Sequence, residues 1–245
     1  MWVKYMQFLS ADINSWMTAV KDQFISTFIT ESRYKLFLEG LGTTLKITLF
    51  AAIFGFLLGS LLAFMRMSRR RNGKKTIFSL LAGLYIDVIR GTPSVVQLLI
   101  MYNIILVAVD NKVMIAIVAF AINSSAYVAE IVRAGIQAVD SGQTEAGLSL
   151  GLPKRTTMLH IIIPQAIKNV LPPLGNEFIV LLKETAIVGY IALMDLTKAS
   201  DFVITRTFKP YMPLISTAVI YFIIVKILSV LLNRLERRLR QGDSR

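Results

Sequence analysis

The residues best placed to do chemistry in this sequence are charged side chains that fall within long apolar segments. Glu130 and Arg133 lie near the end of one such segment, and Lys183 and Glu184 lie well inside another. Charged groups are costly in a lipid bilayer, so within membrane spans they face a polar path or pair with one another. They therefore predict either the passage of a charged or zwitterionic solute, or mutual neutralisation with a purely structural role.

Further polar residues accompany these charges. Tyr127 precedes Glu130 by three positions and shares its face in a helix. Arg90 and Gln97 flank the sequence Gly91-Thr92-Pro93, where proline disfavours helix at the residue before it. Broken helices line solute cavities in transporters. We expect Arg90 and Gln97 to present polar groups to a translocation path.

The sequence has no pattern typical of an enzyme or a metal centre. It contains no cysteine, which excludes disulfides and cysteine-bound metals. His160 is its single histidine. Its one Gly-Lys pair, at 73–74, is followed by Lys75, where a phosphate-binding loop needs serine or threonine. We therefore predict no catalytic residue, no metal and no cofactor in this chain, and any ATP that drives it must be bound elsewhere.

Composition indicates a membrane protein. Of the 245 residues, 55% are hydrophobic, and the mean hydropathy is +0.62. The net charge of +12 comes from short basic blocks between apolar segments. Such blocks are typical of membrane topology and not of a nucleic-acid surface, so no nucleic-acid partner is expected.

The apolar segments predict an all-α membrane protein with about five transmembrane helices. The expected spans are 41–65, 76–109, 113–132, 172–193 and 212–232. Within the second, the part at 76–93 is either the start of one kinked span or an interfacial helix. Residues 1–40 are expected to form an amphipathic extracytoplasmic segment, 41–233 the transmembrane domain, and 234–245 a basic tail.

Two features of the spans predict packing and orientation. Ala51, Gly55, Gly59 and Ala63 recur at every fourth position, which makes a stripe of small residues where another helix can approach closely. Basic clusters follow the first and last spans, and basic residues mark the cytoplasmic side. We therefore expect the N-terminus outside and the C-terminus inside.

Residues 140–164 form a polar, glycine-containing loop between two spans. Asp140 or Ser141 is suited to cap a short helix, with Gln143 placed to complete a capping box on Asp140. Gly151 is suited to the left-handed position that ends the helix, and Pro153 to the start of the next. The local prediction is a helix, a tight turn and a second helix.

This loop resembles the EAA loop of ABC importer permeases, whose pattern is E-A-A-x3-G-x9-I-x-L-P. The matching positions are Glu145, Ala146, Gly147, Gly151, Ile161 and Pro164. Gly147 replaces the second alanine, and Ile163 replaces leucine. The resemblance implies that this segment is a coupling helix, which in the family docks in a cleft of the ATPase subunit.

Other motifs resemble the permeases for polar amino acids and together cover roughly residues 40–235. They are Arg90-Gly-Thr-Pro with Gln97, the run 127–139, Leu171-Pro-Pro-Leu-Gly-Asn176-Glu-Phe, and Leu181-Leu-Lys183-Glu184-Thr185, with Glu184 where aspartate is usual. The candidate solute path thus comprises Arg90, Gln97, Tyr127, Glu130, Arg133, Asn176, Lys183 and Glu184.

The resemblance implies an importer in a bacterial cytoplasmic membrane, embedded in lipid. Its expected partners are a second permease, identical or homologous, two cytoplasmic ATPases that bind ATP and magnesium, and an extracytoplasmic binding protein that delivers a polar or charged amino acid. The alternatives are an ABC permease for another small solute, an ion-coupled secondary transporter using the intramembrane charges, and a non-transporting scaffold.

Overall fold

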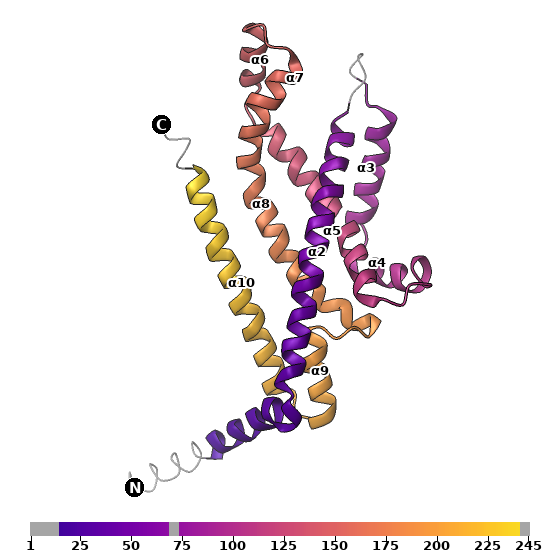
Figure 1. The fold of residues 1–245 in the computed structure, drawn as a ribbon, viewed down its shortest axis with the longest axis vertical. Coiled ribbons are helices and arrows are strands. Elements are labelled where there is room, and N and C mark those ends of the chain that lie inside the picture. Colours follow the sequence, from indigo (N-terminus) through magenta and orange to yellow (C-terminus); the bar gives the residue numbers. More distant parts are fainter. Residues whose placement is uncertain (1–14, 69–73, 241–245) are drawn as a thin grey trace, which may run out of the picture.

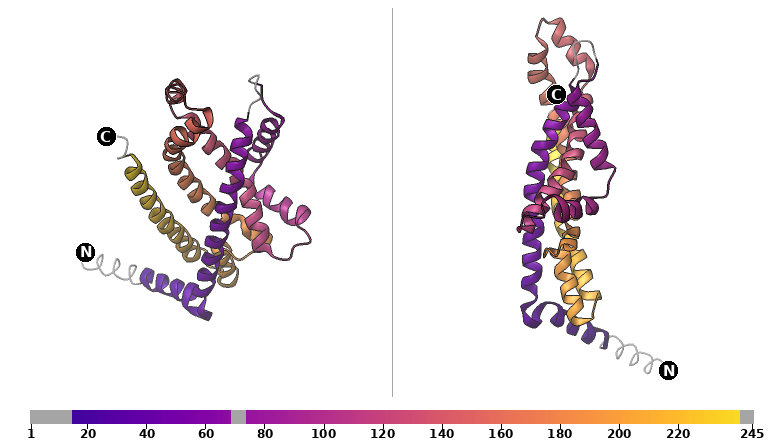
Figure 2. Two further views of the ribbon diagram at one scale, coloured as in Figure 1. Left: turned by 45° about the horizontal axis from the view of Figure 1, so that its top comes forward. Right: turned by 90° about the vertical axis from the view of Figure 1, so that its right-hand side faces the viewer.

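The computed structural model describes residues 15–68 and 74–240, and its elements are helices, which confirms the predicted all-α class (Figure 1). After a helix at 15–24, the elements in chain order are η1 (Ile25–Ile29), η2 (Thr30–Ser32), α2 (Tyr34–Met67), α3 (Ile77–Arg90), α4 (Ser94–Ile100), η3 (Met101–Ile105), α5 (Lys112–Gln137), α6 (Ser141–Ser149), α7 (Lys154–Thr157), η4 (Met158–Ile162), α8 (Ile163–Glu184), η5 (Thr185–Ile191), α9 (Leu196–Thr207) and α10 (Tyr211–Arg240). Seen edge-on, the helices form a long, narrow assembly with α6 and α7 at one end (Figure 2).

Helix α5 is the most enclosed of the long helices, and α2 packs along it. In the most apolar stretch of α5, 67% of the residues are buried, against 6% in α10. Gly55 and Gly59 of the small-residue stripe lie against α5: a methyl group added to Gly59 would come within 2.6 Å of the Ser125 carbonyl oxygen and Val128. The stripe therefore brings the two backbones together as predicted, because no larger side chain separates them.

The segment that contains Pro93 bends sharply between α3 and α4. The two directions differ by 105°, so α4 and η3 do not continue the line of α3. The Gln97 amide closes this bend by donating to the carbonyl oxygens of Ile89, at 2.7 Å, and Thr92, at 3.1 Å. Its own oxygen accepts a hydrogen bond from Asn123 of α5 at 2.9 Å, which ties the bend to the centre of the fold.

Helices α2, α5 and α10 are each long and apolar enough to cross a membrane, and the bent α3–η3 pair is a further candidate among the described residues. Helix α8, which overlaps the expected span 172–193, is not among these candidates. It begins at Ile163 rather than Pro172 and includes both Pro172 and Pro173. Helix α8 ends at Lys183 and Glu184, and the chain then tightens into the 3₁₀ turn η5.

The expected domain boundaries fall inside continuous helices. Helix α2 begins at Tyr34 and runs through 40–41, and α10 continues through 233–234 to Arg240. Residues 1–14 of the expected amphipathic segment lie outside the described residues, whereas Phe28 packs against Phe37 of α2. These helices join the N-terminal segment and the basic tail to the body of the protein.

Candidate functional site

The first candidate site is the segment 140–164, and its backbone follows the predicted helix–turn–helix. Asp140 caps α6 by accepting a hydrogen bond from the Gly142 N–H at 2.7 Å. At the other end, Gly151 has φ +78°, and its N–H donates to the Leu148 carbonyl, while the Leu152 N–H donates to Gly147. This pair of bonds is a Schellman motif, which requires the left-handed residue that glycine supplies. The predicted capping box is not observed; the Gln143 side chain instead accepts a hydrogen bond from Gln165 of α8.

Gly147, which stands where the EAA pattern has alanine, is a packing residue of α6. It is the buried residue of α6, and a methyl group added there would lie 2.6 Å from Cγ2 of the buried Thr157. Glycine therefore allows α6 to pack closely on α7. The departure from the EAA pattern is therefore matched to the neighbouring helix.

The rest of α6 faces outward at the end of the molecule (Figure 1). Glu145 and Ala146 are exposed, as is Pro164 at the start of α8. Leu148 is 39% exposed and Leu150 is 81% exposed. Exposed leucines beside an exposed carboxylate form a small amphipathic surface, which is suited to contact with another protein.

The second candidate site is a cavity of about 460 Å³ between α3, α5 and α8. Its charged lining residues are Arg90, Glu130 and Glu177, with Tyr127 and Asn169 as neutral polar neighbours. Three predicted path residues, Arg90, Tyr127 and Glu130, are therefore brought together. The Arg90 guanidinium lies 5.4 Å from the centre of the Tyr127 ring, in a cation–π arrangement that holds this cation at the wall of the cavity.

Glu130 is already paired within its own helix. Its carboxylate accepts hydrogen bonds from Nη2 of Arg133 at 2.6 Å and from Nε at 3.0 Å. Arg133 also donates to Gln137 at 2.6 Å and does not line the cavity. Glu130 and Arg133 thus form a local ion pair, and of the two only Glu130 lines the cavity.

Glu177 is an acidic residue of the cavity that lies outside the predicted path set. It is half-buried on α8, and its carboxylate accepts a hydrogen bond from the Ser124 hydroxyl of α5 at 2.9 Å. In the described parts of the chain, no basic group lies within ion-pair distance of it. Glu177 directly follows Asn176 in the sequence, inside an apolar segment. A charged side chain within a membrane span is the signal by which it could have been predicted as a site residue.

The remaining predicted path residues lie outside this cavity. Gln97 closes the α3–α4 bend, and Asn176 faces a neighbouring cavity between α8 and α10. Lys183 is exposed, and Glu184 is half-buried two helical turns beyond Glu177, close enough to interact with it electrostatically. The structure therefore divides the predicted set among this cavity, a neighbouring cavity, the α3–α4 bend and the end of α8.

Residues 55–241 match the family described as binding-protein-dependent transport system inner membrane component. This chain belongs to that family. The family consists of transporter permeases and not of enzymes, and its apolar helices agree with a multi-pass membrane protein.

Relatives of known name support the same assignment. A putative glutamine transport system permease, GlnP of Rickettsia bellii, is 41% identical over 204 residues, which are 82% of this chain and 91% of the relative. The arginine transport system permease ArtQ of Bacillus subtilis is 40% identical over 210 residues, 84% of this chain and 93% of the relative.

Two solved structures share the fold. A crystal structure of an amino acid ABC transporter with histidines is 48% identical, with a TM-score of 0.78, and covers 86% of this chain and 98% of that one. An inward-facing MetNI methionine ABC transporter is 17% identical, with a TM-score of 0.73, and covers 83% of this chain and 96% of that one. At that identity it supports the fold alone.

Proposed function

We propose that the cavity between α3, α5 and α8 is the membrane path for a polar amino acid, with cationic amino acids favoured. The chain is the permease subunit of an amino acid ABC importer. The observation that carries the proposal is Glu177, a half-buried carboxylate that faces the cavity with a hydroxyl partner and, among the described residues, no basic group within ion-pair distance. An unpaired charge in such a site favours a ligand of opposite charge.

The other lining groups complement an amino acid. Arg90, held over Tyr127, supplies a cation for the solute carboxylate, and Glu177 supplies an anion for an ammonium or guanidinium group. Glu184 adds negative charge on the same side of α8. Permeases named for glutamine and for arginine transport are among the relatives, so both a neutral and a cationic solute are reasonable probes.

We further propose that α6 transmits movement from partner ATPases to the spans. The exposed surface of Glu145, Ala146, Leu148 and Leu150 supports this contact, and the close packing of Gly147 on Thr157 makes α6 and α7 a stiff unit. The family implies a second permease, two ATPases and a binding protein. ATP and magnesium would bind to the ATPases.

The transport proposal is tested with the complex purified through a tag on this chain and reconstituted with its binding protein. We expect ATP-dependent uptake of labelled L-arginine or L-glutamine. Excess L-aspartate should compete at least about tenfold less well than L-arginine, because Glu130 and Glu177 repel a second carboxylate. Uptake by this chain alone, driven by an ion gradient, would instead establish a secondary transporter.

The proposed orientation places α6 inside the cell and the α9–α10 turn outside. Because the chain has no cysteine, single cysteines report on their own positions. We expect Thr205→Cys, on the exposed surface of α9, to react with an impermeant maleimide in sealed cells, and Ser149→Cys, exposed on α6, to react only after permeabilisation. The reverse pattern would invert the topology.

A further inference from the structure

Lys46 is a charged side chain inside the apolar helix α2 that takes no part in either candidate site. It is the only charged residue between Glu39 and Arg66, and it lies within the expected span 41–65. It is exposed, and in the described parts of the chain it makes neither a hydrogen bond nor an ion pair. A charge inside a span is costly unless a partner compensates it, so Lys46 points to a partner outside this chain.

Lys46 lines an exposed groove of about 710 Å³ between α2 and α5. On α2, Lys46, Phe50, Phe54 and Leu58 recur at every fourth position and therefore share one face of the helix. Apart from Asn111, the lining residues of the α5 wall are apolar, namely Val113, Met114, Ile117, Val118, Ala121 and Ile122.

The groove arises from the same small residues that bring α2 and α5 together. A methyl group added to Gly55 would lie 3.3 Å from the carbonyl oxygen of Ala121, so the two backbones nearly touch at the floor of the groove. Phe54 of α2 and Met114 of α5 are exposed and form walls on either side of this contact. The result is an apolar channel that is open along its length.

The two ends of the groove differ in polarity. Because Gly55 lies against Ser124 and Gly59 against Ser125, α2 and α5 run in the same direction, and Lys46 is level with Asn111 at the start of α5. The Asn111 side-chain oxygen accepts a hydrogen bond from the Met114 N–H at 3.1 Å. Its amide nitrogen has no acceptor among the described residues, so this end presents a cation and a donor.

The neighbouring charges do not neutralise this end of the groove. Asp110 and Lys112, on either side of Asn111, carry opposite charges, and neither lines the groove. No acidic side chain is among the lining residues in the described structure. The groove therefore offers a partner for an anion but none for the cationic part of a zwitterionic headgroup.

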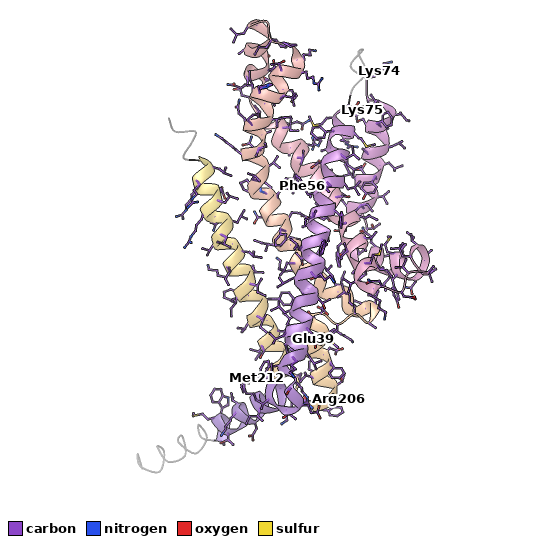
Figure 3. All side chains as sticks on the ribbon, viewed as in Figure 1. Glu39, Phe56, Lys74, Lys75, Arg206 and Met212 are labelled. Carbon is purple, nitrogen blue, oxygen red and sulfur yellow. The ribbon has the colours of Figure 1, made fainter. Side chains whose placement is uncertain are left out.

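The length of the groove matches one leaflet of a bilayer. From Lys46 to Leu58, α2 rises about 18 Å at the usual rise per residue. One leaflet contributes about 15 Å of hydrocarbon, which is half of the core of a bilayer. The polar end lies in the half of α2 away from α6 (Figure 1), in the stretch between Glu39 and Phe56, which are labelled in Figure 3.

We propose that this groove binds an anionic phospholipid of the leaflet that lies away from α6. The Lys46 ammonium pairs with the phosphate, and the Asn111 amide donates to the headgroup. One acyl chain follows the groove past Phe50, Phe54 and Met114. A lysine in a span suits this role, because its apolar stem lies along the helix while its ammonium reaches the headgroup region. The inference goes beyond the proposed function, since the ligand is a lipid and not the transported solute.

The occupant is identified by photocrosslinking in the complex purified through a tag on this chain. The complex is reconstituted in vesicles of dioleoylphosphatidylcholine with dioleoylphosphatidylglycerol as the minor component. The photoreactive residue p-benzoylphenylalanine replaces Phe54 in the groove. The matched control places it at Phe56, which is exposed, does not line the groove and is two residues further along α2, on the opposite side of the helix (Figure 3). Mass spectrometry of the adducts identifies the lipid headgroup.

The ratio of phosphatidylglycerol to phosphatidylcholine adducts should be at least about fivefold higher at position 54 than at position 56, as expected for one lysine acting on an anionic headgroup. Lys46→Gln should remove this enrichment, and Lys46→Arg should keep it because the charge is kept. Lys35→Gln removes an exposed cation about three turns earlier on the same face of α2, outside the groove, and should leave the enrichment unchanged.

Two results would overturn the inference on lipid composition. One is an adduct ratio equal to that of the vesicles at both positions, and the other is an enrichment at position 54 that Lys46→Gln does not change. A third contrary result is an adduct at position 54 with the mass of a second permease. That product would show that this face of α2 packs on another copy of the subunit and not on a lipid.

Discussion

Replacing Gly151 by proline is expected to abolish the stimulation of ATP hydrolysis by solute in the assembled importer. Gly151 has φ +78° and donates its N–H to the Leu148 carbonyl. Proline is restricted to φ near −65° and has no N–H, so it can satisfy neither requirement. The turn that connects α6 to α7 should open, and movement of the ATPases should no longer reach α8. The measurement is solute-stimulated ATPase activity of the purified complex.

A matched variant separates this loss from general misfolding. Asparagine tolerates the left-handed conformation better than other non-glycine residues. Gly151→Asn should therefore keep most of the stimulation, and both variants should insert and melt like the wild type in the transmembrane domain. If Gly151→Pro retained wild-type stimulation in an intact complex, α6 would lose its proposed role in coupling.

The geometry of residues 140–164 was predictable because its determinants are local. Asp140, Gly151 and Pro153 each act through their own backbone conformation or through residues fewer than six positions away. The small-residue stripe of α2 was predictable for a similar reason, since periodic glycine and alanine in an apolar helix have few other uses. These predictions needed no knowledge of which helices are neighbours.

The features that could not be predicted depend on contacts between distant segments. Gln97 was expected to line the path because it follows a helix break, but its amide is used to close that break onto Ile89 and Thr92. Gly147 was noted only as a departure from the EAA pattern, because its contact with Thr157 joins two different helices. Proline is favoured at the start of a helix, and local rules therefore could not show that α8 begins at Ile163 and passes through Pro172.

Predicting which residues line the path cavity also requires knowledge of contacts between distant segments. Glu130 and Tyr127 were identified from spacing within one helix, whereas Glu177 reaches the cavity through its contact with Ser124 of α5, far away in the sequence. The Leu171–Phe178 run was recognised as a motif, but a motif does not show which of its polar residues faces which side. In the structure, Asn176 and Glu177 face different cavities.

The second large effect is expected from Glu177→Gln. Uptake of L-arginine by the reconstituted importer should fall at least about tenfold, equivalent to about 1.4 kcal/mol, because the cavity loses the carboxylate that opposes the solute cation. Uptake of L-glutamine, which has no side-chain cation, should fall less. Glutamine retains the size and hydrogen-bonding ability of glutamate, so its contact with Ser124 is kept and the melting temperature should change little.

Ser124→Ala provides the control for a purely structural role. It removes the hydroxyl that donates to Glu177 at 2.9 Å but leaves the carboxylate in the cavity. If the charge itself serves the solute, Ser124→Ala should keep the preference for L-arginine over L-glutamine, because the carboxylate remains in the cavity even though a hydrogen bond to a charged group, worth about 1.5–3 kcal/mol, is lost. If Glu177 only joins α8 to α5, Ser124→Ala should lower the melting temperature, and any loss of uptake in either variant should be equal for arginine and glutamine. That equal loss would remove Glu177 from the solute path, because a group that recognises a cation must distinguish these two solutes.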